Sequence, residues 1–221
     1  MTSILKTDEI QSQNGGAVVK MQTLKHPSSS GNNLELGSDG TTTITNGTLS
    51  AGTIGSSVTG FGLLTGADQF RLTTNFTVNG FLSGPHVERN DTVFEKIGTG
   101  MGYDSSTGVF TFPNTGIWWI ACGAQSDSNS GAHNYGGINL HVSTTGVSGT
   151  YSSRAVSYDN LIATSSFAST FTSLILDVSS ITSSTAVAVK FKIESSSTNV
   201  RFRGATDKNQ THFTFVRLGD T

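Results

Sequence analysis

The chain has little cysteine for disulfide cross-links and few charged residues. It has a single cysteine, Cys122, among 221 residues, so no disulfide can form within the chain. Only 13% of its residues are charged, which is about half the usual share in a globular protein. The net charge is −2, and lysine and arginine form no cluster that could hold a phosphate backbone. We therefore expect no direct nucleic-acid partner.

Long apolar runs are missing too. The most apolar stretch, Ile117–Cys122, is far too short to cross a bilayer, so no membrane insertion is expected. Residues 1–20 include Asp8 and Glu9 and lack the apolar core of a secretory signal. Because Cys122 lies in that apolar stretch, we interpret it as a small buried hydrophobe and not as a reactive thiol.

Catalytic motifs are also absent from the sequence. It contains no Gly-x-Ser-x-Gly elbow and no His-Glu-x-x-His pair, and one cysteine cannot build a thiolate metal cluster. Gly98–Gly102 precedes a predicted β-turn and not a helix, which is typical of a structural loop. A carboxylate pair for glycoside hydrolysis is not excluded, but nothing points to one. We expect no enzymatic activity, no cofactor and no metal site.

Serine and threonine are the two most abundant residue types, and 26 glycines accompany them. Threonine and the aromatic residues favour strands, glycine and serine favour turns, and strong helix formers are sparse. This composition predicts an all-β fold.

Three regions differ in composition. Residues 1–26 have an ordinary mixture and read as two short strand-like pieces, but they are too few to bury a core alone. Residues 27–67 are rich in Gly, Ser and Thr, with apolar residues that arrive singly. Residues 68–221 have the pattern of a folded domain.

The middle region allows two interpretations. It is either a flexible linker, or a shaft in which three copies wind about a common axis and point their sparse apolar residues inward. The spacing of Ile44, Leu49, Ile54 and Val58 slightly favours the shaft.

Strand-period alternation recurs through residues 68–221, with polar turns between the runs. Several short strands without a convincing helix predict a sandwich or jelly roll. The runs are Phe70–Thr74, Val109–Pro113, Ile138–Val142, Leu174–Val178, Val187–Ile193 and Phe213–Leu218.

The last of these runs is apolar on both faces. Phe213 and Phe215 point one way, and Val216 and Leu218 point the other way, so we expect a second subunit to cover one side. Trp118 and Trp119 likewise point to opposite faces, one toward the core and one toward an interface or the surface. The candidate subunit-interface residues are Trp119, His212, Val216 and Leu218.

The densest motif resembles a trimeric jelly-roll superfamily that includes the globular heads of the first complement component and the tumour necrosis factor ligands. The resemblance rests on Phe94, Gly102–Asp104, Thr107–Pro113, Gly116–Trp118 and Phe213–Leu218. It implies a homotrimer about a three-fold axis, with partners bound at loops or inter-subunit grooves. Some members carry calcium, but no acidic loop pattern maps such a site here, and residues 27–67 lack the strict Gly-X-Y period of a collagen stalk.

The opening Ile4–Gln11, the Gly/Ser/Thr-rich region that follows it and Asp68–Thr74 resemble bacteriophage fibre and appendage proteins. A chain made in a cytoplasm, without disulfides and poor in charge, also fits a particle that is assembled inside a cell and released by lysis. The resemblance implies a location on the virion surface, with residues 1–26 attached to other virion proteins.

The candidate receptor-contacting residues are Asn129, His133, Asn134 and Tyr135 in one loop region, and Arg201 and Arg203 in another. Such residues are good contact groups on rigid β scaffolds. The alternative is an ordinary loop and a solvated strand face.

The leading hypothesis is a homotrimeric tail-fibre or spike protein whose jelly-roll knob, residues 68–221, binds a host surface glycan or protein. The alternatives are a capsid decoration or head-fibre protein with the same knob, and a free lectin-like binding protein.

Overall fold

The computed structural model describes residues 23–24, 34–36, 42–43, 64–77, 79–91 and 95–221. The chain divides into two compact units, Met1–Val58 and Thr59–Thr221. The described part of the first unit is a small antiparallel sheet of β1 (Thr23–Leu24), β2 (Leu34–Leu36) and β3 (Thr42–Thr43). The predicted attachment segment and shaft otherwise lie outside the described residues.

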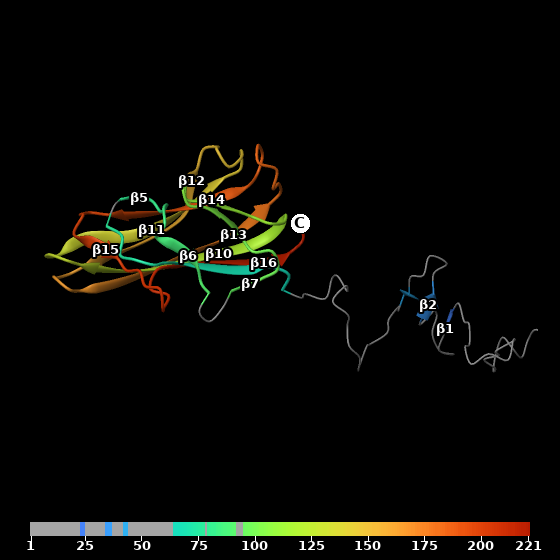
Figure 1. Cartoon of the computed structure of the whole chain (residues 1–221), viewed down its shortest axis with the longest axis horizontal. Helices are drawn as coiled ribbons and strands as arrows, with labels where there is room; N and C mark the ends of the chain where they lie inside the picture. Colours follow the sequence, from blue (N-terminus) through green and yellow to red (C-terminus); the bar gives the residue numbers. More distant parts are fainter. Residues whose placement is uncertain (1–22, 25–33, 37–41, 44–63, 78, 92–94) are drawn as a thin grey trace, which may run out of the picture. The chain divides into compact units, whose positions relative to one another are not determined.

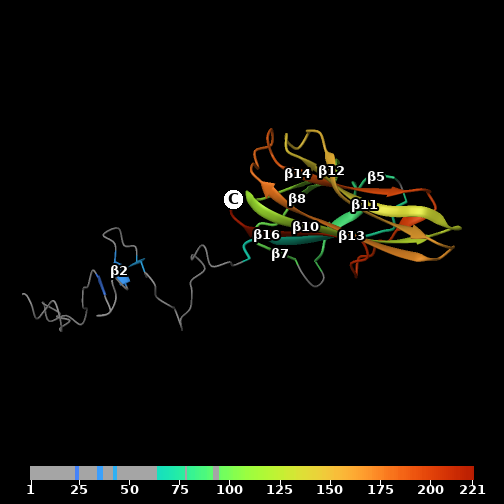
Figure 2. The ribbon, with the colours of Figure 1, turned by 180° about the vertical axis from the view of Figure 1, so that it is seen from behind.

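The second unit is a sandwich of two sheets, seen as two layers in Figures 1 and 2. The seven-stranded sheet has the order β13-β10-β16-β4-β6, with β15 paired to β10 and β7 paired to β4. Its strands are β4 (Ala67–Leu72), β6 (Val87–Arg89), β7 (Lys96–Ile97), β10 (Gly116–Ser128), β13 (Phe167–Val178), β15 (Val200–Phe202) and β16 (His212–Gly219).

The six-stranded sheet has the order β12-β11-β14-β9-β8, with β5 paired to β14. Its strands are β5 (Gly80–Phe81), β8 (Gly102–Asp104), β9 (Val109–Thr111), β11 (His133–Ser143), β12 (Ser152–Leu161) and β14 (Ala188–Ser195). All pairings in both sheets are antiparallel. The sandwich predicted from residues 68–221 is therefore confirmed, and the described part of the chain contains no helix.

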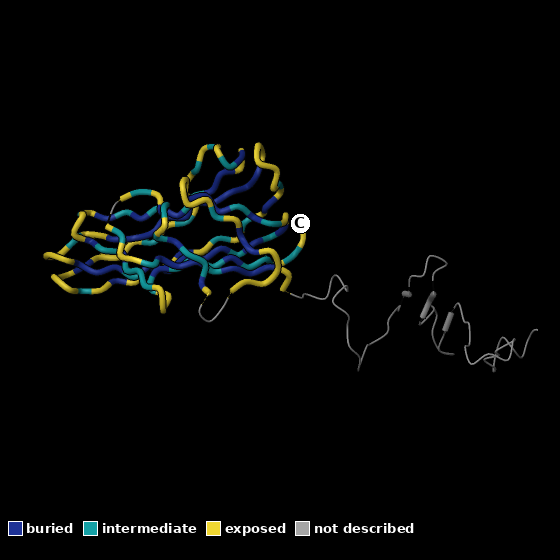
Figure 3. The backbone as a smooth tube through the Cα atoms, viewed as in Figure 1, coloured by how far each residue is buried: buried dark blue, intermediate teal, exposed yellow. Residues whose placement is uncertain are grey.

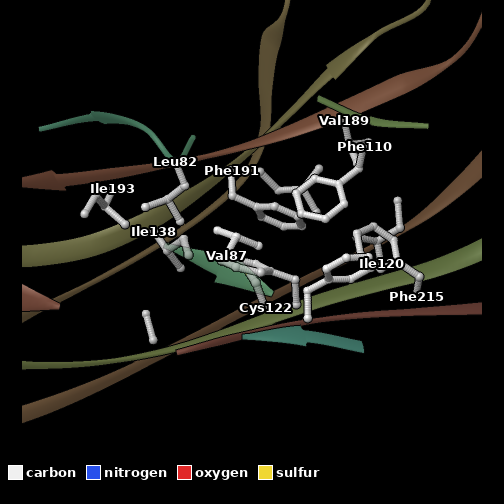
Figure 4. Packing of buried hydrophobic residues seen from close by; sticks show 14 of the residues in the cluster. Leu82, Val87, Phe110, Ile120, Cys122, Ile138, Val189, Phe191, Ile193 and Phe215 are labelled. Atoms are coloured by element: carbon white, nitrogen blue, oxygen red, sulfur yellow. The ribbon is translucent and has the colours of Figure 1, made fainter. Parts of the chain in front are cut away.

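Phenylalanines join the two layers in the core (Figure 4). Phe191 of the six-stranded sheet stacks on Phe213 of the seven-stranded sheet, with ring centroids 4.3 Å apart. Phe110 packs between Phe70 and Phe215 at centroid distances of 5.1 and 5.2 Å. Each fully buried ring contributes about 1.5 to 3 kcal/mol through the hydrophobic effect. The alternating runs read from the sequence supply these rings, and Figure 3 shows the matching alternation of burial along the strands.

The two residues expected inside the core are there. Trp118 and Cys122 are both buried in the main hydrophobic cluster. Burial also raises the pKa of the Cys122 thiol, because desolvation disfavours the thiolate. This confirms that Cys122 is an inert small hydrophobe.

Hydrogen bonds to one carboxylate hold the turn between β8 and β9. The Asp104 carboxylate accepts hydrogen bonds from the Ser106 backbone N–H at 2.8 Å and from the Thr107 hydroxyl at 2.7 Å. Hydrogen bonds from Ser106 and Thr107 lower the pKa of Asp104 to about 2. Gly108 adopts a φ of 71°, which glycine tolerates best. Phe94, part of the family motif, lies outside the described residues.

Candidate functional site

The outward face of the seven-stranded sheet carries large apolar side chains that no residue described by the structure covers. On β13, Phe167, Phe171 and Ile175 are 61, 57 and 64% exposed. They alternate with buried residues at strand period, so they share one face. We call this surface, with Trp119, Val216 and Leu218, the apolar face.

Sheet register brings these residues together from three strands. Ile175 pairs with Trp119 across β13 and β10, and Trp119 pairs with Val216 across β10 and β16. Paired residues of neighbouring strands point to the same side of a sheet. Trp119 and Val216 are half-buried, and Leu218 is exposed. Trp119 and Val216, two of the predicted interface residues, thus lie on one surface with Ile175, while Leu218 lies at a bulge in the pairing of β10 and β16.

His212, the fourth predicted interface residue, lies further along the same face. It pairs with Gly123 of β10, and a Cβ at Gly123 would lie 2.7 Å from the His212 Cε1. Glycine is therefore needed where the imidazole crosses the sheet. Burial lowers the pKa of His212, and its Nδ1 has no hydrogen-bond partner in the described part of the molecule. The ring is consequently neutral at pH 7.

A pocket of about 450 Å³ opens beside this histidine. It is bounded by β10, β13 and the segment that precedes β16, with Phe171, Gln125, Lys208 and His212 among its lining residues. Since the pocket adjoins the apolar face, it is a recess that a second molecule can enter.

Sequence reasoning missed the β13 part of the apolar face. The sequence predicts a strand from the alternation of Leu174, Leu176 and Val178. Phe171 and Ile175, at alternate positions of the same strand that face the other way, are equally apolar. The strand β13 has apolar residues on both faces, as Phe213–Leu218 does. This pattern in the sequence could have identified the β13 part of the apolar face.

The predicted receptor-contacting residues divide between different surfaces. Asn129 and Asn134 are exposed near the end of the sandwich where the loops after β10, β12 and β14 meet. His133 begins β11 and is half-buried. Tyr135 lies on the six-stranded sheet, where its ring packs against Tyr158 with centroids 5.4 Å apart.

Arg201 and Arg203 are engaged by one buried carboxylate. The Arg201 Nε donates to Asp127 Oδ1 at 3.0 Å, and the Arg201 Nη2 forms a salt bridge with Asp127 Oδ2. The Arg203 Nη1 donates to the same Oδ2 at 3.3 Å. Asp127 is paired with Arg201 across β10 and β15. The two guanidinium groups therefore compensate a buried charge, which is a structural task.

The outward face of the six-stranded sheet has a different chemistry. Asn139 is buried beneath it and donates to the Tyr158 hydroxyl at 2.8 Å and to Glu194 Oε2 at 2.7 Å. Lys192 forms a salt bridge with the other oxygen of Glu194. Hydrogen bonds from Lys192 and Tyr158 lower the pKa of Glu194. This face thus combines exposed tyrosines with a connected polar network.

The described ranges contain neither a candidate metal site nor a candidate membrane-spanning helix. These residues contain no group of three or more His, Cys, Asp or Glu side chains placed to hold a metal ion. They also include no helix long and apolar enough to span a membrane.

No protein-family model and no curated protein matches the chain. Among solved structures, it is similar to the Eiger TNF from S. frugiperda, with a TM-score of 0.52 at 10% identity over 70% of this chain and 93% of that one. The sandwich has the jelly-roll fold of tumour necrosis factor. Murine APRIL is also similar, at 12% identity over 69% of this chain and 98% of that one, with a TM-score of 0.46. The jelly roll expected from the sequence is confirmed, while the identities are so low that the likeness concerns the fold alone.

Proposed function

We propose that this chain is a homotrimeric virion fibre or spike component whose jelly roll, residues 68–221, binds a host-cell surface receptor. The observation that carries the proposal is the apolar face. Three large side chains on β13, each more than half exposed, share one outward face of the sheet with Trp119 and Val216. Such a surface on a soluble β protein marks an interaction site.

We assign a second copy of the same chain as the occupant of this face. Interfaces between identical subunits are more apolar than the rest of a protein surface and are enriched in aromatic residues. The apolar face has both properties, and the pocket beside His212 supplies a recess into which a neighbour can fit. In a closed assembly about a three-fold axis the contacts are heterologous, so the apolar face of each subunit would pack against a different surface of its neighbour, in agreement with the trimeric family that the sequence resembles.

The virion part of the proposal is supported by the sequence. The opening segment resembles those of phage fibre and appendage proteins, and residues 27–67 suit a shaft. A capsid decoration or head-fibre protein with the same jelly roll is the second candidate, since its assembly would use the same face. Binding without catalysis agrees with the absence of catalytic motifs from the sequence.

The test is the mass of the purified full chain in solution, measured by light scattering behind a sizing column. We expect about 69 kDa for three chains of 23.1 kDa. A mass of one chain at micromolar concentration would refute the trimer. Immunogold labelling of particles would then separate fibre from capsid, because label on the head alone contradicts a tail location.

A further inference from the structure

The outward face of the six-stranded sheet presents aromatic rings at two places. Tyr135 and Tyr158 are 40 and 44% exposed and form an edge-to-face pair. Phe81, on β5, is also exposed and packs edge-on against His141. Exposed rings with polar neighbours can stack on the C–H face of a sugar ring while adjacent groups bind its hydroxyls.

Between the rings lie polar groups whose positions are already fixed. The Glu194 carboxylate is held by Lys192, Tyr158 and Asn139, and Ser153 donates to Asn139 Oδ1 at 3.1 Å. Because these side chains are held in one conformation, a ligand that binds them loses little additional side-chain entropy. Planar amides and carboxylates of this kind suit the paired hydroxyls of a sugar.

Lys190 differs from its neighbour Lys192. Its ammonium lies 5.2 Å from the Phe81 ring centroid and 4.7 Å from that of Tyr151. Among the described residues, no carboxylate is within salt-bridge distance of it, whereas Lys192 is paired with Glu194. A cation held between two rings, with no counter-ion from this part of the chain, is complementary to an anionic group of a ligand.

The register sets the length of a matching ligand. Tyr158 on β12 is opposite Gly137 and Lys190 on β14 is opposite His141, so the two residues are offset by four positions along β11 and lie on strands either side of it. This is roughly 14 Å along the strands and about 10 Å across them, which is more than one sugar ring.

We propose that this face binds an acidic oligosaccharide, with one sugar ring stacked on Tyr158 and an acidic group of another sugar against Lys190. The inference rests on the proposed function, because it names the chemical class of the receptor. A protein ligand suits the face less well, since its centre at Asn139, Lys192 and Glu194 is polar.

The experiment uses the full chain on a printed array of acidic and neutral oligosaccharides, followed by calorimetry. Sialyllactose and trigalacturonate represent two sources of an acidic sugar, with lactose and maltotriose as neutral counterparts. We expect one of the acidic probes to bind about tenfold more tightly than its neutral counterpart, the factor that one charge-assisted contact supplies.

Three variants locate the site. Lys190→Gln should reduce the affinity for the acidic probe to that for the neutral one, and Tyr158→Ala should weaken both by about tenfold. Lys96→Gln removes an exposed lysine of the seven-stranded sheet and should leave the affinity unchanged. Circular dichroism and solution mass verify that each variant folds and assembles.

The proposal is overturned if no acidic oligosaccharide binds, or if binding survives both Lys190→Gln and Tyr158→Ala. Adhesion to host cells that resists periodate but is lost on protease treatment would identify a protein receptor, which refutes the glycan and leaves the receptor-binding function standing. A monomeric chain, by contrast, refutes the proposed trimer whatever the array shows.

Discussion

The two outward faces of the sandwich are built by the same strand alternation and yet are chemically opposite. On the seven-stranded sheet, outward positions of β13, β10 and β16 carry Phe171, Ile175, Trp119 and Val216. On the six-stranded sheet, outward positions carry a hydrogen-bonded network centred on Asn139.

The difference indicates which face is buried in an assembly and which face stays in contact with water. Strands that are apolar on both sides are stable only when both sides are covered, whereas a polar outer face needs no partner. The first face therefore suits permanent burial between subunits, and the second suits reversible contact with a polar ligand.

The largest expected effect comes from placing charge on the apolar face. Phe171→Glu combined with Ile175→Glu would bury two carboxylates in each interface, which is strongly unfavourable. We expect the mass by light scattering to fall from three chains to one. The matched control, Val156→Glu, alters a residue that is 50% exposed on the opposite sheet and should leave a trimer; dissociation there as well would contradict the assignment of the interface.

The next effect tests whether Arg201 is structural. Arg201→Gln leaves the buried Asp127 carboxylate with Arg203 as its remaining ion-pair partner, and loss of one partner of a buried pair costs about 3 kcal/mol. Urea unfolding should show this loss. An unchanged midpoint together with loss of cell binding would instead identify Arg201 as a receptor contact.

A smaller loss is expected on the polar face. Asn139→Leu leaves Tyr158, Glu194 and Ser153 without their shared partner, at a cost of about 1 to 3 kcal/mol. Val156→Ala, beside it in the register, should change the free energy of unfolding by less than about 0.5 kcal/mol. If Asn139→Leu and Val156→Ala lower the free energy of unfolding equally in chemical denaturation, the hydrogen-bonded network makes no specific contribution to stability.

The smallest expected effect is a pH dependence of trimer association through the apolar face. Burial lowers the pKa of His212, so the folded state disfavours its protonated form, and stability from this group is lost as the pH falls below about 6.5. Lys208 lines the same pocket, and Arg71, the partner of His212 in the register, is paired with Glu88 and Asp91. Trimer dissociation measured between pH 7 and 5 should be reduced in His212→Gln; an identical profile would exclude the histidine.

The strands could be predicted from the sequence because a sheet with one buried face has an apolar residue at every second position of its strands. Each of the six runs identified in the sequence overlaps a strand, and the turn from Asp104 to Gly108 has the chemistry its residues predict. β12 was missed because most of its residues are exposed and its outward side chains include Arg154, Val156 and Tyr158, so no clear apolar alternation marks it.

The candidate sites were less readable because they depend on register between distant segments. Trp119 and Val216 were found from their own strands, but the pairing of Trp119 with Ile175 on β13 joins segments about 50 residues apart in the chain. The sequence leaves open whether Arg201 is a contact group or part of a solvated strand face, because its partner, Asp127, is distant in sequence.

By itself, the sequence determined that the chain is all-β, that Trp118, Cys122, Phe213 and Phe215 lie inside, and that some strands are apolar on both sides. These properties are local, because they follow from side-chain period and turn chemistry. Tertiary structure decided which outward residues share a surface, that Arg201 and Arg203 serve Asp127, and that Tyr135 meets Tyr158. Such groupings are set by sheet order and register, which the whole chain specifies through its packing and no single segment encodes.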